Sequence, residues 1–576
     1  MNVAAGQSSD RNRPPDCLEQ LMPTSPISAR TAGAAYPAST PRSDWSLAAC
    51  SSRLGTLIAA LLTGCSSLPP GSDFPRKASS ALAHPEETRL GRQFEQGVRE
   101  HDGNSGFRII PVGADGFLLR MQMINAAERT LDLQYFIFRG DETGKMLTAS
   151  ALRAADRGVR VRVLIDDGET EAGDEQVTAL QAHPSVEIRI YNPFAYRGHA
   201  KLFRAVEFMF NASRLDYRMH NKLLVVDNAV ALIGGRNIAD PYFQIDPESQ
   251  FADDDVFAAG PVARTLSATF DEYWNAALSI PVEALSGEKP SRAELDERRE
   301  ELEEHNQQPK ADGADYVKRI ASGEPFNGIT SGRLPLVWAH AQVVCDSPDK
   351  KNVENGAMVG RLMQRPVARA TRAVQSELLM VTPYLIPGNE GMQLFKDLRQ
   401  RGVRVRVLTN SLESSTVPLA QSGYMHYRVP LLDIGVELYE IRSLLGNARG
   451  SGQTEAISRY GNYSLHAKLF VLDRQRLFIG SMNFDQRSMH LNTEIGLLID
   501  SPELARQIAG RFEAMVQPVN SYMLALRRNA EGALPSVVWH TQEGTQAVDY
   551  VTEPARSNWQ RAKVDLLSLL PLDDEL

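Results

Sequence analysis

The sequence has few of the features that mark zinc-binding, disulfide-stabilised and membrane-spanning proteins. Its four cysteines, Cys17, Cys50, Cys65 and Cys345, are spaced like neither a zinc site nor a disulfide framework. The apolar run Leu54–Leu62 is too short to cross a bilayer as a permanent helix. The net charge of −9 argues against a general nucleic-acid-binding protein, which would carry a basic face. We therefore expect no metal, no cofactor and no nucleic-acid partner.

Two stretches of the chain, 246 residues apart, repeat one pattern of polar residues. The first contains His220, Lys222, Asp227, Gly234 and Asn237, and the second contains His466, Lys468, Asp473, Gly480 and Asn483. The octapeptide RGVRVRVL also occurs twice, at Arg157–Leu164 and at Arg401–Leu408, with an offset of 244 residues. Because the two offsets agree, an internal duplication explains both repeats.

Hydrophobic patterns predict an α/β sandwich in each copy, because strands alternate with helices. In the first copy we expect helices over Gly113–Glu128, which reads as amphipathic, and Lys145–Asp156, with strands over Thr130–Phe138, Val159–Asp166 and Val186–Tyr191. In the second copy we expect strands over Glu377–Leu385, Val403–Thr409 and Val436–Ile441, with a helix over Gly391–Arg401.

Composition divides the chain into seven segments. They are a disordered extension upstream of the true start (1–53), a lipoprotein signal (54–65), a Pro/Ser-rich tether (66–87), a first domain (88–282), a charged linker (283–330), a second domain (331–519) and a C-terminal tail (520–576). Only Cys345 of the four cysteines falls in a domain, where we expect a buried small hydrophobe.

Cys65 closes a segment that resembles a bacterial lipoprotein signal. Arg53 precedes the apolar run Leu54–Leu62, and the small residues before Cys65 fit a cleavage site. More than 50 residues precede this segment, so a chance apolar stretch is the alternative. Cys50 fits the cysteine pattern too but has no apolar run before it. We expect lipidation at Cys65, which would anchor the protein to a bacterial membrane facing the periplasm.

The repeated residues suit the chemistry of a phosphodiester. Its anionic oxygens repel nucleophiles, so a site must supply fixed positive charge, one group that attacks phosphorus and another that protonates the leaving oxygen. One imidazole cannot act on both sides of the phosphorus, so we predict that His220 and His466 face each other across it. Lysines 222 and 468 would supply charge, and Asn237 and Asn483 would supply neutral donors.

The spacing within each motif predicts local structure. His220 and Lys222 alternate as in a strand and share one face. Asp227 and Asp473 lie on the other face near a turn, and we interpret them as structural braces, with a catalytic role as the alternative. Gly234 and its counterpart in the second motif are expected where the backbone closely approaches a ligand or a neighbouring strand.

The paired HxKxxxxD motifs, each followed by G[GS]xN, resemble those of the phospholipase D superfamily. The likeness is closest to bacterial cardiolipin synthases of the C type and covers about residues 90–576. It extends to MHNK at Met219–Lys222, GGRNIAD at Gly234–Asp240, LPLVWA at Leu334–Ala339, LTNSL at Leu408–Leu412, GVELYE at Gly435–Glu440, IGSMNFDQRS at Ile479–Ser488 and NTE at Asn492–Glu494.

The resemblance implies two α/β/α halves packed as a pseudo-dimer with one active site at their interface. It implies a covalent phosphohistidine on His220, with His466 as the acid and then the base, although the reverse assignment stays open. An acidic residue about 30 positions after each histidine would orient the rings. Asp253 and Glu494 fit this spacing, although Asp254 or Asp255 could take the place of Asp253. Ser481, which faces Gly235 in the first motif, would give a hydroxyl donor to one side only.

The implied activity is phosphatidyl transfer that makes cardiolipin. The substrates would be phosphatidylglycerol, phosphatidylethanolamine or cardiolipin, at a membrane, and we expect a monomer. The alternatives are a hydrolase of the phospholipase D or nuclease type, with water as the acceptor, and a lipoprotein that binds lipid without catalysis.

Three further stretches remain ambiguous. His199 begins the same HAKLF sequence as the second motif but lacks the aspartate, glycine and asparagine, so we predict no catalytic part for it. Phe203–Phe210 is expected to pack in the core, or else to line an acyl-chain entrance. Asn558–Leu570 places Trp559, Ala562, Leu566, Leu569 and Leu570 on one side, which predicts a docked surface helix, or else one that contacts a membrane.

Overall fold

The computed structural model describes residues 69–168, 174–198, 201–245, 249–286, 291–307, 325–445, 462–528 and 535–569. Cys65, the apolar run before it and His199 lie outside these residues, so the interpretations of these segments stay predictions. Among the described residues, no helix combines the length and the apolar character needed to cross a membrane.

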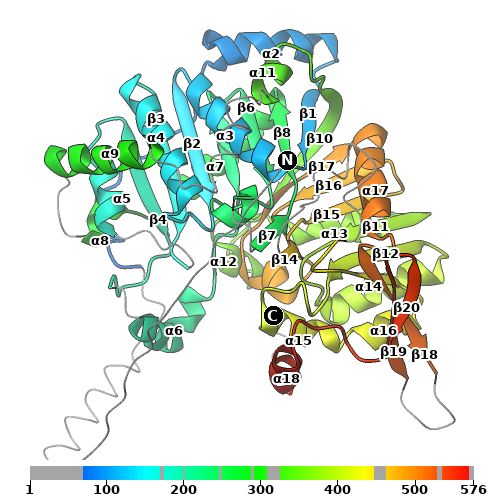
Figure 1. The fold of residues 1–576 in the computed structure, drawn as a ribbon. Helices are drawn as coiled ribbons and strands as arrows, with labels where there is room; N and C mark the ends of the chain where they lie inside the picture. Colours follow the sequence, from blue (N-terminus) through cyan, green and yellow to red (C-terminus); the bar gives the residue numbers. More distant parts are fainter. Residues whose placement is uncertain are drawn as a thin grey trace, which may run out of the picture. The chain divides into compact units, whose positions relative to one another are not determined.

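The first half of the described chain is built on a mixed sheet (Figure 1). Its strands are β1 (Ser105–Ile110), β2 (Thr130–Tyr135), β3 (Arg160–Asp166), β4 (Val186–Tyr191), β5 (Leu223–Val226), β6 (Val230–Gly234), β8 (Asp255–Ala259) and β9 (Ser279–Pro281). They pair in the order β9-β4-β3-β2-β5-β6-β8-β1. Strands β2, β3 and β4 are parallel, and the other pairings are antiparallel.

The second half repeats this order. Its strands are β10 (Val337–Cys345), β11 (Glu377–Val381), β12 (Arg404–Asn410), β13 (Glu437–Ile441), β15 (Leu469–Leu472), β16 (Arg476–Gly480), β17 (Ile495–Asp500), β18 (Ser521–Arg527), β19 (Ser536–Glu543) and β20 (Gln546–Tyr550). They pair as β10-β17-β16-β15-β11-β12-β13-β18-β19-β20. Strands β1 and β10 pair antiparallel and join the halves into one 18-stranded sheet. The duplicated α/β fold is confirmed.

Helices cover both sheets and fill the space between them. They are α2 (Arg89–Glu100), α3 (Gly113–Ala126), α4 (Glu142–Asp156), α5 (Asp174–Gln181), α6 (Lys201–Leu215), α7 (Pro261–Trp274), α8 (Val282–Ser286), α9 (Arg292–Gln307), α11 (Pro325–Thr330), α12 (Lys350–Glu354), α13 (Gln364–Arg372), α14 (Gly388–Gln400), α15 (Pro418–Met425), α16 (Arg428–Asp433), α17 (Pro502–Met515) and α18 (Asn558–Leu567). Short turns of helix are η1 (Pro85–Glu87), η2 (Asp240–Phe243) and η4 (Arg487–Leu491). Helices α7 and α17 share one apolar core with strand residues of both halves, such as Leu223 and Leu469, which makes the pseudo-dimer a single packed unit.

The elements predicted in each copy are present, and both RGVRVRVL segments lead into equivalent strands, β3 and β12. The amphipathic character predicted for Gly113–Glu128 is wrong. Helix α3 is buried nearly all round because α4, α11 and η2 cover it, and even Arg120 is buried, where its guanidinium donates to Asp255 at 2.8 Å. A paired charge at this position is compatible with burial.

Three segments expected to be loosely attached are packed on the domains. In the segment expected as a tether, the guanidinium of Arg76 donates to the carbonyls of Ala276, Ala277 and Ser279. In the segment expected as a linker, helix α9 buries Leu302 against α4 and α5. The segment after residue 519 adds β18, β19 and β20 to the second sheet. Charged and polar composition concealed these contacts because each segment buries only a few side chains.

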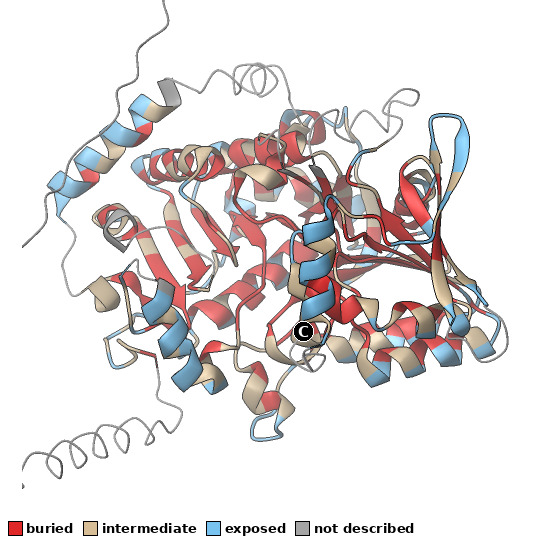
Figure 2. Ribbon diagram, turned by 60° about the horizontal axis from the view of Figure 1, so that its bottom comes forward, coloured by how far each residue is buried: buried red, intermediate tan, exposed pale blue. Residues whose placement is uncertain are grey.

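Two apolar segments face outward instead of inward. Core packing was the expectation for Phe203–Phe210, but helix α6 exposes most of its large apolar side chains. The apolar stripe of α18 also faces away from the protein, and Val564 on the opposite side is the buried contact. Figure 2 shows the exposed residues along α18, next to the C-terminal mark.

Candidate active site

The two motifs lie at the carboxyl edge of the parallel strands. Strand β5 is antiparallel to β2 and pairs Leu223 with Gln134, so the residues just before β5 lie where β2 ends. In the second half, Leu469 at the start of β15 pairs with Val381 at the end of β11. The motif histidines and lysines therefore precede their strands instead of lying within them, and each histidine exposes only 7% of its surface.

Each histidine is held by a carboxylate from the other half. The Nδ1 atom of His220 lies 3.0 Å from both carboxylate oxygens of Glu494. The Nδ1 atom of His466 lies 2.5 Å from Oδ2 of Asp253. A carboxylate that accepts from Nδ1–H leaves Nε2 without a proton and fixes the ring orientation. The site is therefore composite, and each half supplies a ring and the carboxylate that holds the other ring.

The backbone repeats this exchange between halves. The N–H of His220 donates to the carbonyl of Thr493 at 2.9 Å, and the N–H of His466 donates to the carbonyl of Ala252 at 2.7 Å. Thr493 and Ala252 are the residues directly before the two carboxylates. Strands β7 (Ser249–Ala252) and β14 (Asn462–Leu465) pair in parallel across the halves and extend the contact.

The lysines bring positive charge to both rings. The ammonium groups of Lys222 and Lys468 donate to the carbonyls of their own motif histidines, Lys222 at 2.6 Å. Burial and the charges of both lysines hold the pKa of each histidine well below its usual range. Because each lysine acts on both histidines, the four side chains share one site. Both rings are neutral near neutral pH, as a nucleophile and a base require.

Burial also shifts the other ionisable groups of the site. It lowers the pKa of Lys222, and it lowers the pKa of Lys468 to about 8. It raises the pKa of Asp253, and it raises the pKa of Glu494 to about 7. Lys468 and Glu494 titrate close to neutral pH, so they can exchange protons during a reaction, which is typical of catalytic sites.

Gly235 and Ser481 make the halves unequal in a way that differs from the sequence-based expectation. The hydroxyl of Ser481 donates to Oε2 of Glu494 at 2.5 Å, so it holds the carboxylate instead of pointing a donor at phosphate. A side chain at Gly235 would lie 2.2 Å from Oδ1 of Asp253. Glycine is required in the first motif because the carboxylate of Asp253 occupies this space. The glycines that precede them, Gly234 and Gly480, closely approach neighbouring strands β8 and β17.

The two motif asparagines are also held differently. The side-chain carbonyl of Asn237 accepts from the N–H of Ile137 at 3.1 Å, and its amide donates to the hydroxyl of Tyr242 at 2.9 Å. Asn483 is buried, and within the described part of the chain its side-chain oxygen accepts no hydrogen bond. Since a buried polar atom normally has a partner, Asn483 is the motif amide with capacity left for a ligand.

Asp227 and Asp473 lie in the turns that follow β5 and β15, both with a positive φ. The carboxylate of Asp227 is buried and accepts from the backbone N–H groups of Glu128, Arg129 and Thr130 at 2.8–3.0 Å. The carboxylate of Asp473 accepts from the equivalent N–H groups of residues 375–377 near the surface. Each brace ties the motif turn to the residues that begin the neighbouring parallel strand.

This difference in burial predicts unequal losses of stability. In Asp227→Ala one buried and two part-buried N–H groups lose their acceptor, which should lower the free energy of unfolding by about 3 kcal/mol. In Asp473→Ala water can replace the carboxylate, so we expect a loss of about 1 kcal/mol. Both alanines would have nearly the same positive φ. Backbone strain is therefore common to the two variants, and the difference between them reports the lost hydrogen bonds. Calorimetric unfolding measures the difference, and equal losses would contradict the bracing role of the buried carboxylate.

Several residues around the site were not identified from the sequence. The ring of Phe136 meets His220 edge-on at 4.9 Å, and Tyr242 meets His466 edge-on at 5.0 Å. The guanidinium of Arg236 donates to the carbonyl of Asp253 and to Asp255 at 3.0 Å. These residues close the site and fix its carboxylate. Arg236 stands inside the first motif where the second has Met482, a difference in charge that could have identified it.

The residue before each histidine is fixed by the end of the duplicated strand. The carboxylate of Asp166 accepts from the N–H of Met219 at 2.8 Å. Asn410, at the equivalent position, accepts from the N–H of Leu465 at 2.8 Å. The offset of 244 between them is that of the RGVRVRVL repeat, and each follows the octapeptide at the same distance, so the repeat could have identified this pair of positions.

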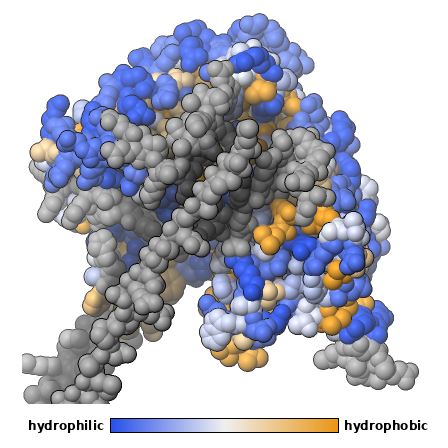
Figure 3. Space-filling view, viewed as in Figure 1, coloured by the Kyte–Doolittle hydropathy of each residue, from blue (hydrophilic) through white to orange (hydrophobic). Residues whose placement is uncertain are grey.

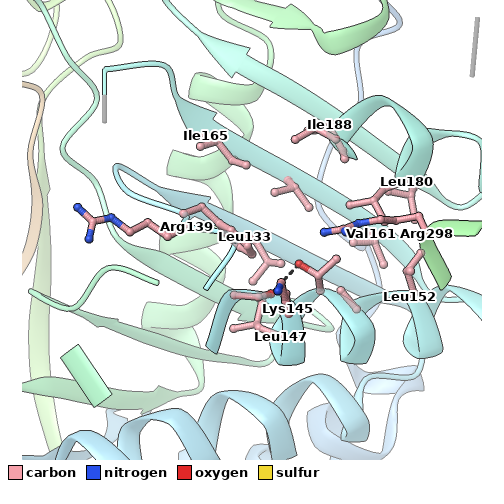
Figure 4. Close-up of a pocket in the computed structure, with 18 residues that line it drawn as sticks. Leu133, Arg139, Lys145, Leu147, Leu152, Val161, Ile165, Leu180, Ile188 and Arg298 are labelled. Atoms are coloured by element: carbon pink, nitrogen blue, oxygen red, sulfur yellow. Dashed lines mark hydrogen bonds between the residues drawn. The ribbon is translucent and has the colours of Figure 1, made fainter. Parts of the chain in front are cut away.

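An apolar pocket lies elsewhere in the first half, between β2–β4 and helices α4, α5 and α9. Figure 4 shows Leu133, Val161, Ile165 and Leu152 around it, and the residues that line it include neither motif histidine. The described residues hold no cluster of His, Cys, Asp and Glu that could bind a metal. Cys345 is buried and free, as predicted.

Comparisons with known proteins identify relatives over most of the chain. Residues 121–274 and 368–516 match the family described as "Cardiolipin synthase, PLD-like domain". Cardiolipin synthase C of Escherichia coli (strain K12) is 34% identical over 478 residues, which is 82% of this chain and 97% of that protein. An uncharacterized protein of Helicobacter pylori (strain ATCC 700392 / 26695) is 28% identical, over 86% of this chain and 95% of that protein. The solved phosphatidylserine synthase of Haemophilus influenzae Rd KW20 is 13% identical, with a TM-score of 0.47 over 75% of this chain and 92% of that chain.

Proposed function

Because the chain belongs to the family of cardiolipin synthase PLD-like domains, we propose that it is a phosphatidyltransferase that makes cardiolipin. The observation that carries this proposal is the crossed pairing of His220 with Glu494 and of His466 with Asp253. It gives two rings whose Nε2 atoms are available in one charged, nearly closed site. The donor and the acceptor would be phospholipids, phosphatidylglycerol in the simplest case.

In the first step, Nε2 of His220 attacks the phosphorus of a phosphatidylglycerol. The bond between phosphorus and the headgroup oxygen breaks, and His466 donates its Nε2 proton so that glycerol leaves. Protonation of His466 is favoured when substrate is bound. The two ammonium groups of the site are already balanced by two carboxylates, so the phosphate adds a negative charge that stabilises a positively charged ring. Lys222, Lys468 and Asn483 would stabilise the charge on the equatorial oxygens.

In the second step, Nε2 of His466 takes the proton from a primary hydroxyl of a second phosphatidylglycerol. The new oxygen–phosphorus bond forms as the phosphorus–nitrogen bond to His220 breaks, and cardiolipin leaves. Both rings return to their starting states. For transfer to win over hydrolysis, a lipid alcohol positioned by its headgroup must take the place of water, which would give phosphatidic acid instead.

The products test this proposal directly. The purified chain is incubated with vesicles of phosphatidylglycerol and phosphatidylethanolamine, and the lipids are separated by mass. Cardiolipin with released glycerol or ethanolamine supports transfer. Phosphatidic acid without cardiolipin would make the chain a hydrolase, and unchanged lipids with retained vesicle binding would make it a lipid-binding lipoprotein.

The ionisable groups predict a narrow pH optimum. As the pH falls through about 7, the pair of Glu494 and His220 takes up a proton, which stops attack by the ring. As the pH rises through about 8, Lys468 loses the charge that binds phosphate. We expect kcat/KM to be highest between these values. In Lys468→Arg the alkaline fall should become shallower, because the guanidinium stays charged while Lys222, whose pKa burial also lowers, still titrates; an unchanged alkaline fall would contradict the assignment to Lys468.

We also propose that Cys65 carries the lipid anchor and that the enzyme faces the periplasm. The support is the sequence around Cys65, with Arg53 and the apolar run before it. Mass spectrometry of the mature protein is expected to find a lipid-modified N-terminal Cys65. An unmodified chain that begins upstream of Leu54 would contradict the anchor without affecting the proposed chemistry.

A further inference from the structure

Helix α6 has its polar face toward the protein and its apolar face outward. Leu202, Val206 and Met209 form an exposed row at helical spacing, joined by Phe203 and Phe210. Met209 exposes 77% of its surface. A surface helix of a globular protein normally shows the opposite arrangement. A contiguous exposed apolar patch of this kind marks an interaction surface.

The polar face of α6 is built into the first half, so the outward orientation is fixed. The carboxylate of Glu207 accepts from the backbone N–H groups of Ala195 and Tyr196 at 2.6 and 2.8 Å. The guanidinium of Arg214 donates to Asn192 at 2.7 Å, and that of Arg204 lies over the ring of Phe194 at 4.2 Å. Turning the apolar face inward would break these contacts and leave the N–H groups that Glu207 accepts from without their acceptor.

Helix α18 repeats this arrangement on the second half. Trp559 and Leu566 lie on one face of the helix and expose 77 and 68% of their surfaces, Leu569 just beyond the helix exposes 78%, and Val564 packs against the protein. The side-chain amide of Gln560 donates to the carbonyl of Leu412, which follows β12, and fixes the helix there. Figure 3 shows hydrophobic residues gathered at the lower tip of the molecule, where Figure 1 places α18.

Both helices lie on the edge of the sheets that carries the histidines. Helix α6 follows the carboxyl end of β4 and leads back to His220, and α18 packs on α15, which follows the carboxyl end of β12. Both project from the lower side of Figure 1, and Figure 2 brings that side forward. The two outward apolar faces therefore flank the approach to the active site, one from each half.

We infer that α6 and α18 form a docking face that inserts its apolar side chains into the surface of a phospholipid bilayer. The inference rests on the proposed function, because phospholipid substrates lie in a bilayer and the site must reach their headgroups. Phenylalanine, tryptophan, leucine and methionine on fixed helices suit the boundary between headgroups and acyl chains. Lys563, exposed on α18, is placed to meet lipid phosphates. This face presents the site to the bilayer independently of any lipid on Cys65.

The test uses the full chain with Cys65→Ala, so that a lipid anchor contributes nothing. The α6 variant carries Phe203→Ser and Met209→Ser, and the α18 variant carries Trp559→Ser and Leu566→Ser. We expect each to bind vesicles of phosphatidylglycerol and phosphatidylethanolamine at least about tenfold more weakly in co-sedimentation. The matched control carries Met523→Ser and Val551→Ser, which are also exposed but lie on and beyond the added strands, and should bind like the parent.

Activity and fluorescence give independent readouts. With substrate in vesicles, both face variants should lose activity by about tenfold, whereas with a monomeric short-chain phosphatidylglycerol they should stay within about twofold of the parent. In the parent chain, adding vesicles should shift tryptophan emission to shorter wavelength, and Trp559→Phe should remove the shift while keeping the binding. We expect the variants to keep the fold of the parent chain, because the substituted side chains face outward.

Vesicle binding that is unchanged in both face variants, or no emission shift that depends on Trp559, would overturn the inference. If the parent chain is a dimer in sedimentation and the variants are monomers with intact vesicle binding, the face is instead an interface between two copies. Failure of the proposed function is a separate result. Vesicle binding through this face without any lipid product would support the docking face and contradict the proposed phosphatidyltransferase activity.

Discussion

His220→Ala is expected to lower the rate of phosphatidyl transfer by at least about a thousandfold while the protein remains folded. In the proposed mechanism the ring supplies the atom that bonds to phosphorus, and alanine leaves nothing that can replace it. Cardiolipin formation from vesicles measures the loss. His199→Ala is the control, because it has the same local sequence as the second motif without the rest of it, and it should keep full activity. If the His220→Ala variant were as active as the His199→Ala control, the proposed enzymatic role of His220 would be contradicted.

The order of the two histidines can be tested with a donor that needs no acid. A phosphatidyl ester of p-nitrophenol releases a stable phenolate, so His466→Asn should still react once at His220. We expect a burst of about one equivalent of nitrophenolate and a phosphorylated His220 peptide in mass spectrometry. A burst from His220→Asn with the modification on His466 would reverse the assignment.

Glu494→Gln is expected to lower kcat by about a thousandfold, even though Glu494 follows the motif of the other half. The carboxylate fixes the ring of His220 with Nε2 free, and an amide can instead donate to Nδ1 and favour the wrong tautomer. The loss should fall on the burst phase of the nitrophenyl donor. Since glutamine does not titrate near neutral pH, the acid fall of the pH profile should also move to lower pH.

Asp253→Asn is the matched control for this crossed arrangement. It perturbs His466, so the burst should stay fast and the second step should become slow. In a His220→Ala background, Glu494→Gln should cost nothing further, because the residue it orients is gone. If Glu494→Gln instead spared the burst and slowed only the second step, each carboxylate would serve the histidine of its own half, contrary to the geometry.

The local pattern of the sequence predicted much of the fold because the relevant physics is local. In both copies, valine and arginine alternate along the RGVRVRVL segment, and a predicted helix precedes it. Strands β3 and β12 could therefore be placed from this periodicity. The segments after residue 519 and around α9 could not be placed this way. Their attachment depends on a few buried side chains, such as Leu302, whose partners are distant in the chain.

For the site, too, the sequence predicted one part and not the other. The repeated motif predicted the residue types, including the second-motif serine and the first-motif glycine. It did not predict which residue each of them contacts. Ser481 holds Glu494, and Gly235 leaves room for Asp253, because the two halves pack face to face and exchange their carboxylates. Spacing along a chain carries no information about which half a side chain will meet.

The sequence by itself determined a duplicated α/β protein and predicted that two histidines and two lysines form a phosphodiester site. Only the tertiary structure decided that each histidine is oriented from the opposite half, since this follows from the antiparallel pairing of β1 with β10 and the shared core between the sheets. It also decided that the apolar rows of α6 and α18 face outward. Helical periodicity gives a row of apolar residues, but its direction depends on the polar contacts on the other face of the helix, and those contacts exist only in the folded chain.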